Sequence, residues 1–182
     1  MKNLFGLFLS TAIFSCSGVK VMNTESAADA DFSKAKTFGF YTVKASGDTI
    51  TESFSKRIVY LQDAIGSEMK KRGFTNAGSN PDLLINIGIV VQEKVQTRET
   101  NWQQDGRFTY VGQRNYTWKS TEVELGRYRE GTVTVHIVDA LKNNMMWKGS
   151  ANGVIPEKEK NIAEAAQKGM EELFKKFPVA AK

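Results

Sequence analysis

The sequence has few of the residues on which most enzyme and metal sites depend. Its 182 residues include one cysteine and one histidine. A metal site needs three or four ligands at a suitable spacing, and a nucleotide site or a serine hydrolase needs a glycine-rich loop or a Gly-x-Ser-x-Gly turn. None of these patterns occurs. We therefore expect no cofactor, no metal and no catalytic residue, and we interpret His136 as an ordinary residue on a sheet face.

A long hydrophobic run is also missing. The apolar segment 4–14 follows Lys2 and ends at Ser15-Cys16. It is too short to cross a bilayer, because a spanning helix needs about 20 apolar residues. A basic start, a short apolar run and a small residue at its end are typical of an export signal. We predict that residues 1–15 are a signal peptide.

The single cysteine lies directly after this run. Residues 9–16 resemble the lipobox of bacterial lipoproteins, in which the cysteine receives a diacylglyceryl group and becomes the new N-terminus. The alternative is an ordinary signal peptide cut near Ala27-Ala28, with Cys16 incidental. Lipidation is favoured because an exported protein with one free thiol would carry a redox liability. We expect a membrane anchor at Cys16 and a location in the bacterial envelope, at the outer membrane facing the periplasm.

The charge excess is small. Lysine and arginine number 25 against 20 acidic residues, a net charge of +5. Part of the excess positive charge lies at the C-terminal end of a predicted helix, in Lys70, Lys71 and Arg72, where cations complement the helix dipole. Nucleic acid is therefore not an expected partner. Residues 16–30 have few large apolar side chains, so we predict a lipidated N-terminus and flexible tether there, and a single domain over 31–182.

Apolar periodicity predicts the elements of that domain. Phe54, Ile58, Leu61, Ile65 and Met69 share one helix face, which Gly73 ends, and a second helix over 162–177 ends at Pro178. Strands are predicted at 36–43, 83–91, 107–125, from Gly131 onward, and at 149–155. The order β-α-β-β-β-β-α predicts an α+β fold of two layers, with a mostly antiparallel sheet of about five strands and two helices packed on one face.

Several short segments resemble a known family. They are Asp31-Phe32, Lys36-Thr37-Phe38-Gly39-Phe40, Pro81-Asp82-Leu83-Leu84-Ile85, Gly131-Thr132-Val133 with Val138-Asp139, and Trp147-Lys148-Gly149. On these segments the chain resembles the bacterial lipoprotein family of domain of unknown function 4136, over most of residues 29–178. The resemblance implies an exported, lipid-anchored α+β domain of no established activity.

Two groups of residues are candidates for function. Glu122 and Glu124 could act as a glycosidase carboxylate pair, but Arg127 and Arg129 nearby favour ion pairs on a solvated face. The second group is aromatic, and four of its members share one strand parity: Trp102, Phe108, Tyr110, Tyr116 and Trp118. Such a stripe is either core or a surface for stacking and docking.

Three functions follow from these observations. The first is a non-enzymatic lipoprotein that binds another envelope component, a protein or a glycan. The second is a small-ligand or glycan-binding lipoprotein that uses the aromatic stripe, and the third is a carboxylate-dependent hydrolase. The sequence favours the first, because it contains no complete catalytic set.

Overall fold

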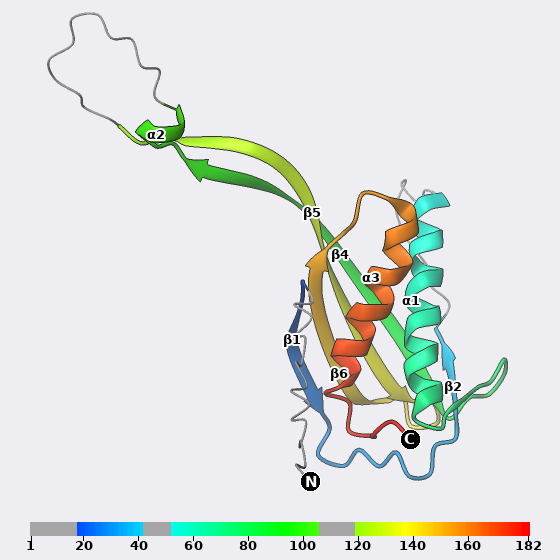
Figure 1. Ribbon diagram of the computed structural model, residues 1–182. Helices are drawn as coiled ribbons and strands as arrows, with labels where there is room; N and C mark the ends of the chain where they lie inside the picture. The colour runs from blue at the N-terminus through cyan, green and yellow to red at the C-terminus, as the bar shows by residue number, and fades with distance from the viewer. Residues whose placement is uncertain (1–17, 42–51, 106–118) are drawn as a thin grey trace, which may run out of the picture.

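The computed structural model describes residues 18–41, 52–105 and 119–182 (Figure 1). Along the chain the strands are β1 Val19–Ser26, β2 Thr37–Phe40, β3 Thr75–Asn76, β4 Leu83–Glu99, β5 Glu122–Asp139 and β6 Asn144–Val154. The helices are α1 Glu52–Lys71, α2 Trp102–Asp105 and α3 Glu159–Phe174.

The six strands form one open sheet in the order β1-β6-β5-β4-β2-β3. β2 runs parallel to β3 and to β4, and the other neighbours are antiparallel. The two long helices, α1 and α3, pack against each other and cover one face of the sheet (Figure 1). The predicted α+β class with helices on one face is confirmed.

The core lies between the helices and that face. Leu83, Ile85, Val135 and Ile137 are buried, and Ile87, Ile89 and Val133 are partly buried against them, as strict alternation along two strands predicts. From α1 the core receives Leu61, Ile65 and Met69. The side chain of Phe54, predicted to share their face, lies outside the described residues.

The helix end at Gly73 is also confirmed. Gly73 has φ of +90°, which favours glycine, and the amide of Phe74 donates to the Met69 carbonyl at 3.2 Å. This bond pattern closes α1 in the manner of a Schellman motif.

Asp82 explains why two of the family segments occur together. Its Oδ2 accepts hydrogen bonds from the amides of Lys36 and Thr37 at 2.8 and 2.9 Å and from the Thr37 hydroxyl at 2.8 Å. These bonds, first the one from the Lys36 amide, hold the pKa of Asp82 below its ordinary value. The carboxylate thus fixes the start of β2 beside the start of β4, where the two strands pair in parallel.

Two predictions about elements need correction. Residues 19–26, predicted to be part of a tether, form the edge strand β1, which pairs with β6. The predicted break at Gly131 does not occur, because β5 runs without interruption from Glu122 to Asp139. Among the described residues the sheet therefore has six strands rather than about five, and the short helix α2 makes three helices rather than two.

Candidate functional site: the hairpin arm

β4 and β5 extend well beyond the rest of the sheet. β6 pairs with β5 only as far as Glu130, and the Ile155 amide then donates to the Arg129 carbonyl at 2.8 Å. Beyond Arg129, β4 and β5 pair only with each other among the described residues. We call residues 93–99 and 122–129 the arm. Seven residues at about 3.3 Å each give it a length of roughly 20 Å. It projects away from the helices and carries α2 at its far end (Figure 1).

Exposed charges and exposed apolar side chains share the arm. Val95 and Leu125 are about half exposed, at 50% and 54%. Leu125 lies at a β-bulge, where the register changes between Gln96 and Thr97. A bulge bends and twists the ribbon, which is consistent with the curve of the arm in Figure 1.

The carboxylate pair considered from the sequence lies on this arm. Glu124 accepts a hydrogen bond from Arg127 Nε at 2.9 Å, and Arg127 Nη1 also reaches Glu93 on the neighbouring strand at 3.4 Å. The ion-pair interpretation is therefore confirmed for Glu124 and Arg127. Both side chains are largely exposed.

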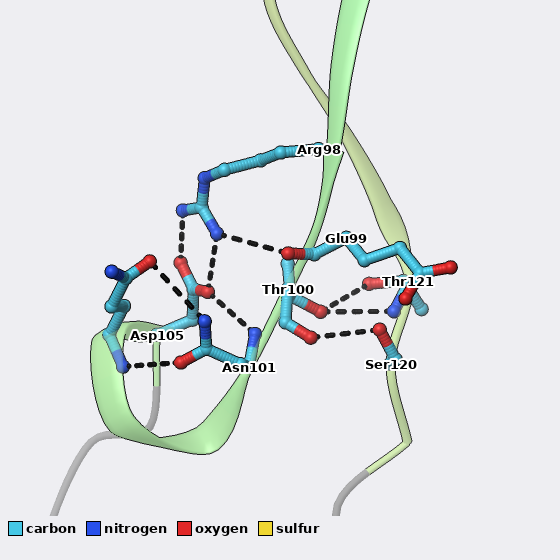
Figure 2. A network of polar contacts seen from close by, with 8 residues as sticks. Arg98, Glu99, Thr100, Asn101, Asp105, Ser120 and Thr121 are labelled. Carbon is cyan, nitrogen blue, oxygen red and sulfur yellow. Dashed lines mark hydrogen bonds and ion pairs between the residues drawn. The ribbon is translucent and has the colours of Figure 1, made fainter.

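A polar network joins the two strands at the end of the arm (Figure 2). The Thr100 amide donates to the Thr121 carbonyl at 2.8 Å, and the Thr121 amide donates to Thr100 Oγ1 at 2.9 Å. Ser120 Oγ adds a hydrogen bond to the Thr100 carbonyl at 2.8 Å. Thr100 is only 9% exposed, so the two strands are joined at this end by hydrogen bonds around a buried residue.

Arg98 and Asp105 fix α2 against the arm. Both guanidinium Nη atoms contact the Asp105 carboxylate, with Nη1 to Oδ2 at 2.7 Å (Figure 2). The same Oδ2 accepts the Asn101 amide at 3.0 Å, and Asn101 Oδ1 accepts the Gln104 amide at 2.9 Å. Asn101 therefore caps the start of α2. The predictions from sequence do not include this site, although Asn101 before a short polar segment is a recognisable capping signal.

The Arg98–Asp105 pair predicts acid sensitivity of the arm end. The hydrogen bonds from Arg98, and then from the Asn101 amide, lower the pKa of Asp105 to about 2. Because the folded pKa is below the unfolded value, the stabilisation is complete above about pH 4 and is lost as the pH falls towards 2. The protection factors of the Asn101 and Thr121 amides, which are corrected for the intrinsic pH dependence of exchange, should fall over this window. In Asp105→Asn they should be low already at pH 5; equal protection factors in the two proteins at pH 5 would contradict the assignment.

Several predicted site residues lie outside the described part of the chain. They are Cys16, Phe108, Tyr110, Tyr116 and Trp118. α2 begins at the backbone of Trp102, whose side chain lies outside the described part of the structure. The lipidation site and the aromatic stripe therefore stay predictions.

His136 lies on β5 between the buried residues Val135 and Ile137, so its side chain points to the sheet face away from the helices. Its partners in register on the neighbouring strands are Asn86 and Lys148.

Within residues 18–41, 52–105 and 119–182, no three side chains of histidine, cysteine, aspartate or glutamate gather closely enough to hold a metal ion. In the same residues no helix has the length and apolar character to cross a bilayer.

Comparison with known proteins decides the family. The model of one family matches residues 22–179, which include the sheet, α1, the arm and α3. The chain belongs to that family, Domain of unknown function (DUF4136). The segments that define the resemblance have structural roles in this DUF4136 domain: Asp82 bonds to the start of β2, and Trp147 packs over Gly149. No curated protein matches the chain.

Solved structures with a similar fold are distant in sequence. A PDZ domain protein from Parabacteroides distasonis has a TM-score of 0.53 and 18% identity, over 91% of this chain and 38% of its own. The chain thus spans well under half of that protein. A PelC dodecamer from Paraburkholderia phytofirmans has a TM-score of 0.44 and 10% identity, over 90% and 97% of the two chains. A neuraminyllactose-binding hemagglutinin homolog from Helicobacter pylori has a TM-score of 0.39 and 15% identity, over 79% and 83%. The first likeness shows the fold alone.

Proposed function

We propose that this DUF4136 protein is a lipid-anchored lipoprotein of the bacterial envelope that works by binding another envelope component, without catalysis. The anchor is supported by the apolar run 4–14 and by Ser15-Cys16 directly after it. Two or more acyl chains on one cysteine would hold the domain at the outer membrane for long times.

The arm is the observation that carries the binding role. An isolated two-stranded ribbon is at best marginally stable in water. This one nevertheless extends about seven residues past the sheet, and its end is fastened by Arg98, Asp105 and Thr100. A projecting element that is held in shape without contributing to the core is best explained by a partner that contacts it.

The chemistry of the arm supports binding rather than catalysis. A general acid or base works best with a pKa near the operating pH. The pKa of Asp105 is about 2, and Glu124 is engaged by Arg127. Asp105 is therefore not suited to exchange protons at neutral pH, whereas apolar side chains bordered by polar ones are common at docking surfaces.

Replacing Cys16 by alanine tests the anchor. We expect the wild-type protein in the membrane fraction and the Cys16→Ala protein in the soluble fraction, because the variant has no thiol to acylate. Mass spectrometry of the wild-type N-terminus should show an acylated cysteine. An unmodified N-terminus beyond residue 17, or a variant that stays with the membrane, would show that the anchor is not at Cys16.

A further inference from the structure

An apolar cavity lies between the helices and the sheet, close to the base of the arm. Its volume is about 130 Å³. α1, α3 and the neighbouring strands β4, β5 and β6 all contribute to its wall, and six of the lining residues are Leu61, Ile89, Val133, Ile155, Ala166 and Met170. The cavity is partly open to solvent, so a small molecule can reach it without unfolding of the domain.

Gly169 shows that this is unfilled space within the helix layer. The residue is buried on α3 and lines the cavity, yet a Cβ built on it would meet no heavy atom within 4 Å. Gly66, also buried but on α1, behaves differently, because its Cβ would lie 3.8 Å from the Phe38 ring, an ordinary contact. Protein interiors are normally packed as closely as organic crystals, so the space at Gly169 is unusual.

Among the described residues, Arg57 is the one charged residue in the cavity wall. Its Nε is buried and, among the described residues, has no hydrogen-bond partner. A buried donor without a partner is costly. The other polar side chain of the wall, Asn152, is already occupied, since its Nδ2 donates to Thr132 Oγ1 at 3.0 Å. The wall therefore combines apolar surface with one unsatisfied cationic donor and no acidic group.

We propose that this cavity binds a single-chain fatty acid, with its carboxylate at Arg57 and its methylene chain against the apolar wall. A carboxylate accepts the hydrogen bonds that a guanidinium donates, in a charge-assisted pair. The volume sets how much of the chain is enclosed. An engineered apolar cavity of about 150 Å³ holds benzene, so the space here takes about six carbons and longer chains extend through the open side. The proposal does not depend on the anchor at Cys16 or on the arm.

Binding is tested by calorimetric titration of the full chain carrying Cys16→Ala, which avoids detergent, with butanoate, hexanoate, octanoate and decanoate below their micellar concentrations. Each methylene added between butanoate and hexanoate should tighten binding about fourfold, and octanoate and decanoate should add little more because their chain ends extend out of the cavity. Decyltrimethylammonium, with the same tail and the opposite charge, should bind at least tenfold more weakly than decanoate. Equal affinity for the two amphiphiles, or no saturable binding of decanoate, would overturn the proposal.

Variants locate the site. Arg57→Gln should weaken decanoate binding about tenfold, and Arg57→Lys should retain most of it. Gly169→Ala should weaken binding several-fold and Gly169→Leu should abolish it, because each side chain occupies the cavity. Gly66→Ala is the matched control, since it makes the same change at a buried helical glycine outside the cavity and should leave affinity unchanged. Decanoate binding that Gly169→Ala and Gly169→Leu leave intact would show that the ligand lies elsewhere.

Discussion

Replacing Arg72 by methionine should lower the free energy of unfolding by about 3 to 5 kcal/mol, the range found when one partner of a buried ion pair is removed. Arg72 and Glu68 are 7% and 2% exposed, and Nη1 of Arg72 lies 2.7 Å from Glu68 Oε2. The guanidinium also donates to the carbonyls of Phe174 at 2.7 Å and Val179 at 3.0 Å. One side chain therefore joins the end of α1 to the end of α3 and to the chain beyond it. Urea denaturation of the two proteins measures the loss.

Lys71→Met is the matched control for this prediction. Lys71 contacts the other oxygen of Glu68 at 2.7 Å, but its side chain is 46% exposed. An exposed partner contributes less than about 1 kcal/mol. The double variant Glu68→Leu/Arg72→Met should be more stable than Arg72→Met alone, because in the single variant the buried Glu68 carboxylate keeps only its half-exposed partner Lys71. If Arg72→Met costs no more than Lys71→Met, the pair does not join the two helices as described.

Replacing Trp147 by alanine should cost about 3 to 5 kcal/mol, since a large buried aromatic leaves a cavity that the core cannot close. Trp147 is fully buried, with its ring 5.5 Å from that of Phe174 and 5.1 Å from that of Phe177. Its Nε1 has no hydrogen-bond partner among the described residues, so Trp147→Phe loses no polar contact and should cost distinctly less. Thermal and urea unfolding of both variants check the difference.

The Trp147 ring packs directly over Gly149. A Cβ at Gly149 would lie 2.5 Å from the Trp147 ring and 2.9 Å from Leu173 Cδ1. Gly149→Ala should therefore cost about 1 to 3 kcal/mol through overpacking. Gly153→Ala, on the same strand, should change stability by less than about 0.5 kcal/mol, because its nearest contact would be 3.6 Å away. Equal effects at the two glycines would contradict the close approach of the indole to Gly149.

Periodicity predicted the parts of the fold that have one buried face. The alternation from Leu83 onward and the helical stripe ending at Met69 both point to the core, and a one-residue slip would expose either set. The prediction that a strand begins at Gly131 was wrong, because this glycine lies within β5. Its Cβ would come within 3.1 Å of Ile155, so this glycine permits close approach of another segment instead.

β1 and α2 were missed for different reasons. β1 is an edge strand in which Val19 and Val21 pack against the core while Met22 is 57% exposed, so its apolar pattern is too weak to indicate a strand. α2 has four residues, which is too short for a helical period to be visible. The Arg98–Asp105 contact depends on the chain reversing at α2, and spacing alone did not reveal it. The cavity at Gly169 depends on how helices and sheet meet, which no sequence pattern records.

The most direct test of the proposed binding role is photo-crosslinking in intact cells. A photoreactive amino acid is placed at Gln96 on the arm and, as a control, at Leu141, which is 94% exposed in the turn at the opposite end of β5. We predict that Gln96 yields one reproducible envelope partner and that Leu141 does not. Arg98→Asp should abolish that product, and Arg98→Asp/Asp105→Arg should restore it by reforming the pair with reversed charges. A product from Leu141 alone, or none from Gln96, would contradict the account.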